Sequence, residues 1–190
     1  SGQAVMNLVE KNIRPRDIVT KKSLENAAVI VAASGGSTNA ALHLPAIANE
    51  AGIKFTLEDV TKISKKTPYI ADLKPGGKYV AKDLYEIGGV PILTKALLDG
   101  GFLHEDCMTV SGKTIGENHK DIVFPTDQKV VYKTSKPISS SGGFVGLKGN
   151  LAPDGAIIKV AGLKKKKFIG KAKCFDGEQS ALNAVLEKKI

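Results

Sequence analysis

The run Gly35-Gly36-Ser37-Thr38-Asn39 is the most distinctive candidate for chemistry in this sequence. Glycines let the backbone approach a ligand closely because they carry no Cβ atom. A helix that begins directly after them would offer free N–H groups and the positive end of its dipole, which suit a phosphate, a carboxylate or a cluster sulfide. A plainer interpretation is a tight helix–helix turn with Ser37 as an ordinary cap. The Gly-Lys-Ser/Thr ending of a Walker loop is absent from this run.

The three histidines are weaker candidates for a site. His43 lies one helical turn beyond Asn39, so it either faces the same site or is buried with its ring nitrogens satisfied. His104 and His119 lie near turns and have no evident partner in the sequence.

The two cysteines, Cys107 and Cys174, lie far apart and form no CxxC pair. No histidine lies at metal-ligand spacing from either, so we expect neither a metal site nor a disulfide framework. A reducing compartment, the cytoplasm, is the default for such a chain.

Two further glycine-containing segments resemble binding motifs at first sight. Ser111-Gly112-Lys113-Thr114 has the tail of a Walker motif, but the upstream glycine of that motif would fall at Cys107. We therefore expect a strand-to-helix turn capped by a hydroxyl group. The segment 146–155 is a turn-rich loop whose glycines fit a bend or a bulge, and its local chemistry names no reaction. The chain shows no defensible Ser/His/Asp arrangement, glycosidase-like carboxylate pair or cluster-binding cysteine set.

Helices are expected to position these residues in the first half of the chain. Apolar periodicity, hydroxyl caps and Gly or Pro stops mark them. The first expected helix lies around 4–9 and stops at Asn12, and the second is capped by Thr20 and ended by Gly35-Gly36. The third is capped by Ser37 and closed at Gly52, and the fourth is bracketed by Thr56 and Asp59 and ends before Pro68. Two short helices follow over 80–87 and 91–98.

Short strands are expected in the second half, separated by turn formers and followed by a last helix. The strands are Met108 to Val110, Lys129 to Tyr132, Ala156 to Val160 and Lys171 to Phe175, and the helix runs from an Asp176 N-cap to Leu186. Helices followed by strands predict an α+β fold, or two domains that meet around residues 105 to 125.

Composition sets broad limits on the class of protein. The 190 residues are 42% hydrophobic and 25% charged, as in ordinary globular proteins, and only 5% aromatic with no Trp, so the core must be aliphatic. The net charge of +9 and the run Lys164 to Lys167 raise the possibility of an anionic partner. One lysine run is more typical of a solvated loop, and no aromatic residues gather near it for stacking, so we expect no nucleic-acid partner.

No apolar run reaches the ~20 residues of a membrane span, so no membrane partner is expected. The N-terminus lacks a signal-peptide layout and does not begin with Met, which fits a fragment of a longer chain.

Ordered motifs along the chain resemble one family of dehydratases. The family unites dihydroxy-acid dehydratase, phosphogluconate dehydratase and sugar-acid dehydratases. The matching segments are Gly35 to Leu44 (GGSTNAALHL), Asp72 to Tyr79 against "DLKPSGKY" with Gly76 in place of Ser, Gly88 to Pro91 (GGVP), Thr109 to Thr114 against "TVTGKT", and Leu147 to Gly155 against "LRGNLAPEG".

The resemblance implies a domain arrangement and a reaction. Residues 1–105 would be the helical end of an α/β N-terminal domain, 106–125 a linker, and 126–190 the start of a β-barrel-like C-terminal domain. The implied enzyme is a homodimeric hydro-lyase that converts 2,3-dihydroxy acids of the 2,3-dihydroxyisovalerate type to 2-oxo acids in branched-chain amino-acid biosynthesis. It would use an iron–sulfur cluster and a magnesium ion.

The same resemblance predicts which parts of the site this chain carries. The cluster cysteines of the family lie upstream of the matched region and its presumed base, a serine, lies downstream. Neither Cys107 nor Cys174 matches a cluster ligand. We therefore expect no catalytic or metal-binding residue, no cofactor on the chain and no activity from the chain alone. Ser37, Thr38 and Asn39 are predicted to line a substrate or cluster pocket.

Two alternatives stay open. A sugar-acid or phosphogluconate dehydratase would carry the same motifs. A non-catalytic basic module that binds an anionic partner belongs to a different functional class.

Overall fold

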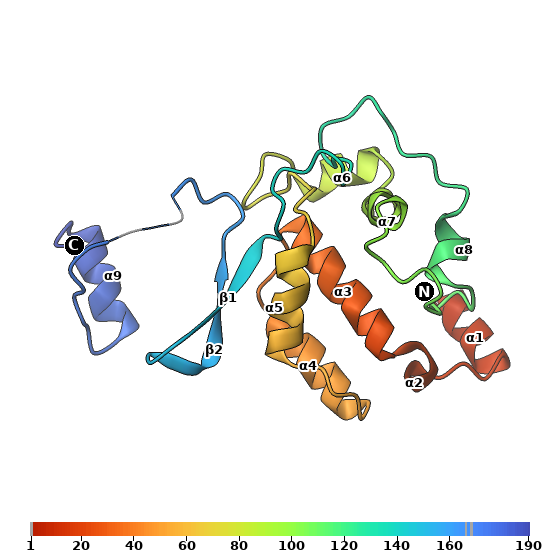
Figure 1. Ribbon diagram of the computed structural model, residues 1–190, viewed down its shortest axis with the longest axis horizontal. Helices are drawn as coiled ribbons and strands as arrows, with labels where there is room; N and C mark the ends of the chain where they lie inside the picture. The colour runs from red at the N-terminus through yellow and green to blue at the C-terminus, as the bar shows by residue number, and fades with distance from the viewer. Residues whose placement is uncertain (1, 166, 168) are drawn as a thin grey trace.

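Helices make up most of the N-terminal part of the chain, and a β-hairpin and a last helix follow them (Figure 1). The computed structural model describes residues 2–165, 167 and 169–190. Its elements are α1 (Gly2–Glu10), α2 (Pro15–Ile18), α3 (Lys21–Ser34), α4 (Ala40–Glu50), α5 (Leu57–Lys66), α6 (Ala81–Glu86), α7 (Val90–Asp99), α8 (Ile115–His119), β1 (Phe144–Gly149), β2 (Ala152–Lys159) and α9 (Glu178–Leu186). This mixture of helices and a small sheet is consistent with the predicted α+β class.

Hydroxyl caps begin three of the helices, as their sequences predict. The side-chain oxygens of Thr20, Thr56 and Thr114 each accept a hydrogen bond from the backbone N–H of the third following residue, at 3.2, 3.4 and 3.1 Å. Such a bond satisfies one of the N–H groups that a helix start leaves without a partner. The hydroxyl cap expected in the 111–114 segment is therefore confirmed at Thr114.

Two other predicted caps are wrong. Asn39, not Ser37, holds the N-cap position of α4 and makes no side-chain cap bond. The Ser37 hydroxyl instead accepts a hydrogen bond from the Asn39 N–H at 3.2 Å, inside the turn that precedes the helix. The last helix has Gly177, not Asp176, at its N-cap.

One of the predicted strands is confirmed and three are wrong. Residues 156–159 lie in β2, but Met108 and Val131 contribute only isolated bridges, to Thr114 and Ala71, and 171–175 is irregular. Around Val131 the reason is a side chain: the Gln128 amide oxygen accepts the N–H groups of Val130 and Val131 at 2.8 and 2.9 Å, so no neighbouring strand can use them.

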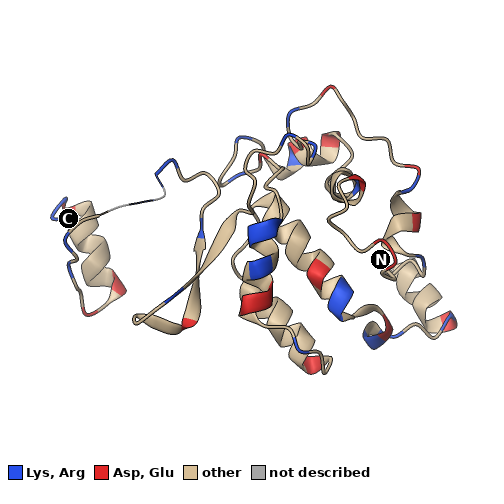
Figure 2. Ribbon diagram, in the orientation of Figure 1, with Lys and Arg blue, Asp and Glu red and all other residues tan. Residues whose placement is uncertain are grey.

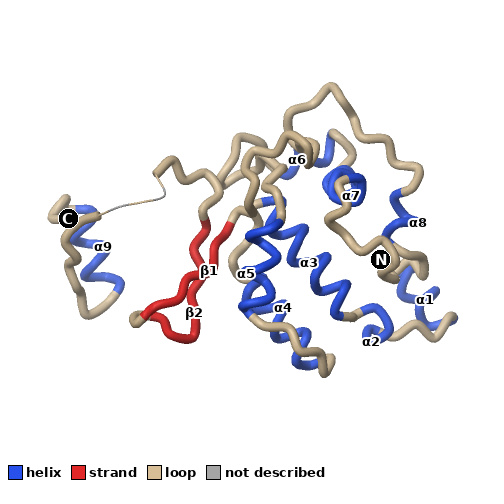
Figure 3. Tube along the Cα trace, in the orientation of Figure 1, coloured by secondary structure: helices blue, strands red, loops and turns tan. Residues whose placement is uncertain are grey.

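The segment 146–155, expected to be a turn-rich loop, belongs to the antiparallel hairpin of β1 and β2. Its register is interrupted between Leu147 and Gly149, which confirms the predicted bend or bulge. Within the described residues this hairpin is the only sheet (red in Figure 3), and the barrel-like C-terminal domain stays a prediction.

Helix α3 separates two buried clusters that make up the core. Its residues Val29 and Ala33 belong to a cluster built with α7 and with two short segments around Ile70 and Val131. Its residues Ala28 and Ala32 belong to the other, which also contains Leu24, Ala41, Leu44, Ala48, Phe55, Val60 and Phe144. Both clusters are largely aliphatic, as the composition predicts.

The C-terminal segment lies apart from this core. In Figure 1, α9 lies at one end of the molecule, away from the helices, and Ala184 is its one buried residue. Lys164, Lys165 and Lys167 are exposed, and Lys166 of the predicted lysine run lies outside the described residues. Figure 2 shows Lys and Arg spread over helices, hairpin and tail rather than gathered on one element. Among the described residues, no helix has the length and apolar character needed to cross a bilayer.

Candidate functional site

An open pocket of about 470 Å³ lies beside the glycine-rich run that the sequence singles out. Its walls are the loop Ser34–Thr38, the segment Leu73–Pro75 and the side chain of Lys159 from β2. We call it the glycine-loop pocket. It joins residues from three distant segments, which include parts of two of the family-like motifs.

Close backbone packing holds the loop in place. Gly35 ends α3 in a left-handed conformation, with φ of 60°, that favours glycine. A Cβ atom on Gly143 would lie only 2.6 Å from the Gly35 Cα atom, and one on Gly76 would lie 2.9 Å from the Ala161 carbonyl carbon. Glycines at these positions therefore let three chain segments meet without side chains between them.

The polar groups around the pocket suit an anionic ligand. The Lys159 ammonium group donates a hydrogen bond to the Gly36 carbonyl oxygen at 3.3 Å, and Lys74 adds a second positive charge. Ser37 and Thr38 bring hydroxyl groups to the same wall. Two ammonium groups and two hydroxyls can hold a carboxylate through charge-assisted hydrogen bonds.

Of the predicted pocket residues, the structure brings Ser37 and Thr38 together at the pocket and places Asn39 at the start of α4. Asn39 is exposed, and its carbonyl oxygen accepts the N–H groups of Leu42 and His43 at 2.9 Å each. Lys74 and Lys159 had no predicted role.

A buried tyrosine supports the loop from inside and was also missed. Tyr69 is 5% exposed, and its ring atom Cε2 would lie 2.8 Å from a Cβ on Gly35. Burial raises the pKa of the Tyr69 phenol, and the nearby charge of Asp72 raises it further, so the group is a neutral hydrogen-bond donor at neutral pH.

A second cavity, of about 370 Å³, lies between the start of α5 and the hairpin. Its acidic wall includes Glu58, whose pKa is lowered by a hydrogen bond from Lys62 and by the positive charges of Lys62 and Lys148. These charges already compensate one another, so the cavity offers a ligand less unpaired charge than the glycine-loop pocket does.

The histidines lie away from the glycine-loop pocket. His43 is exposed on α4, so the interpretation as a buried histidine is wrong. The sequence shows no partner for His104 or His119, and the structure supplies one for each. His119 Nδ1 lies 2.7 Å from the Ile115 carbonyl oxygen.

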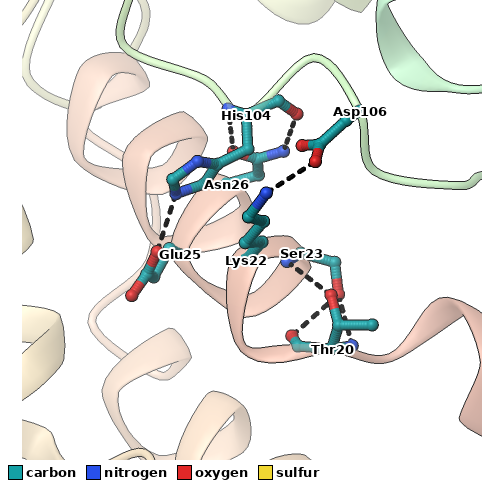
Figure 4. A network of polar contacts seen from close by, with 7 residues as sticks. All are labelled: Thr20, Lys22, Ser23, Glu25, Asn26, His104 and Asp106. Carbon is teal, nitrogen blue, oxygen red and sulfur yellow. Dashed lines mark hydrogen bonds and ion pairs between the residues drawn. The ribbon is translucent and has the colours of Figure 1, made fainter.

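His104 belongs to a polar network between α3 and the loop after α7, shown in Figure 4. The His104 Nε2 atom lies 2.7 Å from a Glu25 carboxylate oxygen. The Asn26 side chain donates to the His104 carbonyl oxygen at 3.0 Å and accepts the His104 N–H at 2.8 Å. Lys22 and Asp106 form an ion pair beside this clamp. The network joins two chain segments that lie far apart in the sequence.

The cysteines are both free, Cys107 buried and Cys174 exposed. Burial raises the pKa of the Cys107 thiol, and the negative charge of Asp106 adds to the effect. In residues 2–165, 167 and 169–190 there is no group of three or more His, Cys, Asp and Glu side chains that could hold a metal ion.

Comparison with known proteins gives matches along almost the entire chain. The model of the dihydroxy-acid/6-phosphogluconate dehydratase N-terminal domain matches residues 1–118, and that of the C-terminal domain matches residues 129–190. A dihydroxy-acid dehydratase of Pelagibacter ubique is 70% identical over 189 residues, which are 100% of this chain and 33% of that protein.

Two further relatives have similar coverage. Dihydroxy-acid dehydratase 2 of Bradyrhizobium diazoefficiens is 65% identical over 185 residues, 97% of this chain and 32% of the relative. A dihydroxy-acid dehydratase of Parvibaculum lavamentivorans is 65% identical over 187 residues, with the same coverage of 97% and 32%. The chain thus spans about a third of the length of the curated relatives it matches.

Proposed function

Because the chain belongs to the dihydroxy-acid/6-phosphogluconate dehydratase family, we propose that the protein containing it is a hydro-lyase acting on 2,3-dihydroxy acids. The substrate is of the 2,3-dihydroxyisovalerate type, in branched-chain amino-acid biosynthesis. A proton leaves C2, the C3 hydroxyl group leaves as water, and the resulting enol tautomerises to a 2-oxo acid. The observation that carries this proposal is the 65% to 70% identity to proteins named dihydroxy-acid dehydratase.

The part of this chain in that reaction is to bind the substrate carboxylate in the glycine-loop pocket. Lys74 and Lys159 supply positive charge, and Ser37 and Thr38 supply hydroxyl donors. Every substrate of the proposed class carries a carboxylate. Such a subsite therefore orients the acid but does not discriminate between substrates that differ in the rest of the molecule. Asn39, at the N-cap of α4, directly follows Thr38 in the chain but is not one of the residues that line the pocket.

The described residues do not fit the iron–sulfur cluster or the magnesium ion that the family resemblance implies. Cys107 is buried and the pKa of its thiol is raised, while Cys174 is exposed. Among the described residues, no three or more His, Cys, Asp and Glu side chains lie together in a group that could hold a metal ion. The roles proposed for the two lysines and the two hydroxyls do not depend on these groups.

We also propose a division of the chain into a domain end at 1–105, a linker at 106–125 and a domain start at 126–190. Separate family models for residues 1–118 and 129–190 support two domains, with a boundary between residues 118 and 129. We further propose a cytoplasmic homodimer. The two free cysteines fit a reducing compartment, and dimerisation follows from the family resemblance.

The test uses the complete protein that contains this chain, with iron and sulfide restored. Formation of 2-oxo acid is measured with 2,3-dihydroxyisovalerate and with 6-phosphogluconate. Turnover of the first substrate is expected, and turnover of only the second would replace the proposed substrate by a sugar acid. Absence of any turnover would overturn the proposed function.

A variant then tests the pocket. Lys159→Met should raise KM for the dihydroxy acid about tenfold with little change in kcat, because it removes one charge-assisted contact to a group that does not react. Lys164→Met, at an exposed lysine that does not line the pocket, is the matched control and should leave KM unchanged. Equal KM values for both variants would exclude Lys159 from the carboxylate site.

A further inference from the structure

The Tyr69 hydroxyl is an anomaly in the packing of this chain. Among the buried side-chain nitrogen and oxygen atoms of the described residues, it is the one without a hydrogen-bond partner. Buried polar groups in folded proteins nearly always have a partner, either in the protein or in a bound molecule. An unpaired donor at this position therefore indicates a partner that is acquired on binding.

The location of the ring shows where that partner would come from. Ring atom Cζ, which carries the hydroxyl, would lie 3.3 Å from a Cβ on Gly35, and Gly35 lines the glycine-loop pocket. The phenol end of Tyr69 thus packs against a glycine of the pocket wall. Tyr69 itself does not line the pocket, so its hydroxyl reaches a ligand there only if the Gly35 backbone shifts on binding. A larger residue at position 35 would collide with the ring.

The backbone of Tyr69 is held by hydrogen bonds, and its ring is enclosed by the packing. Its N–H donates to the Ser139 carbonyl oxygen at 2.9 Å, and its own carbonyl oxygen accepts the Ile138 N–H at 2.9 Å. The side chain is nine-tenths buried. Burial leaves the ring few alternative positions, so little side-chain freedom is lost when a ligand binds, which lowers the entropic penalty of binding.

We propose that Tyr69 is a positioning residue of the glycine-loop pocket, whose hydroxyl donates a hydrogen bond to the bound carboxylate, directly or through one ordered water. Lys74 and Lys159 attract the carboxylate, and Tyr69 fixes its orientation over the Gly35–Thr38 loop. This role rests on the proposed function, since it deepens the same carboxylate site.

The test compares Tyr69→Phe with the unaltered complete protein. The substitution keeps the ring and removes only the hydroxyl. We expect KM for 2,3-dihydroxyisovalerate to rise about tenfold with little change in kcat, because a uniform binding contact is lost. Without ligand, the unfolding midpoint should stay the same or rise, since no hydrogen bond is lost in the free protein. Tyr132→Phe, at a half-buried tyrosine packed on the core, is the matched control and should leave KM unchanged.

A binding measurement separates this inference from the proposed function. The probe is 2-hydroxyisovalerate, which has the carboxylate but lacks the 3-hydroxyl leaving group. It should raise the unfolding midpoint of the unaltered protein more than that of Tyr69→Phe. Equal shifts in both proteins, including no shift in either, overturn the role of Tyr69 even where turnover is normal. A lower midpoint of ligand-free Tyr69→Phe with unchanged KM also overturns it, because the hydroxyl would then be structural.

Discussion

Helix α3 meets distant parts of the chain at two places, and the two contacts are built in opposite ways. At its C-terminal end, Gly35 packs directly on the backbone of Gly143. In its N-terminal half, Asn26 and its neighbours hold the loop around His104 through side chains. The first contact depends on the absence of side chains and the second on their presence. The glycine-loop pocket lies at the first contact.

The difference shows which substitutions each contact tolerates. In a backbone-to-backbone contact no flexible atom can yield, so any added carbon must displace a chain segment. In the side-chain network, most members are partly solvent-exposed, and water can replace a lost partner. Only Asn26 is fully buried there, at 5% exposed. The predictions below test this contrast.

Gly143→Ala should have the largest effect. The added Cβ would lie 2.6 Å from the Gly35 Cα atom, and overpacking of this kind lowers the free energy of unfolding by about 3 kcal/mol. Urea denaturation measures the loss. Gly149→Ala, at the end of the strand that Gly143 directly precedes, is the matched control because its Cβ would meet nothing within 4 Å. A similar loss in both variants would show that the close contact is not what makes Gly143 necessary.

Asn26→Ala should come second. It leaves the His104 N–H and carbonyl groups without their partners, and the free energy of unfolding should fall by about 2 kcal/mol. Hydrogen exchange at the His104 amide should also become faster. Asn49→Ala, at an exposed asparagine of α4, is the control. If Asn26→Ala is no less stable than this control, the clamp does not stabilise the fold.

The Lys22–Asp106 pair should have the smallest effect, because both groups are exposed and water screens their attraction. The hydrogen bond and charge of Lys22 lower the pKa of Asp106 below that of an ordinary aspartate. The stabilisation is therefore fully present above the ordinary aspartate pKa and is lost as the pH falls through the lowered one. Unfolding of Asp106→Asn and of the unaltered protein, compared across the acid range and with added salt, measures it. A difference that persists below that range or in high salt would contradict the assignment.

Local chemistry explains why the helix starts could be predicted and β1 could not. Thr20 and Thr56 cap helices through bonds to residues three positions away, so the signal lies within one turn. Strand β1 contains Gly146 and Gly149, which favour a turn. In the structure Gly146 is required instead by Thr61, whose side chain packs where a Cβ would lie. That reason comes from α5 and is not visible in the strand's own sequence.

Some residues of the candidate site could likewise be predicted from the sequence, and others could not. Ser37 and Thr38 follow the glycines directly, so their place beside an anion-friendly loop could be predicted. Tyr69 and Lys74, from the connection between α5 and α6, and Lys159, from β2, reach the loop from two other segments. Spacing along the chain carries no information on such a meeting, and only Lys74 lay within a motif that had been singled out.

The short segment held by the Gln128 hydrogen bonds has a consequence for how the chain folds during its synthesis. Val130 and Val131 complete a cluster whose other members include Ile70 and Leu97, which leave the ribosome earlier. Until these valines emerge, that side of the helical part remains uncovered, and an exposed apolar surface favours aggregation. The growing chain thus passes through a vulnerable interval that ends when this short segment joins the helices already made.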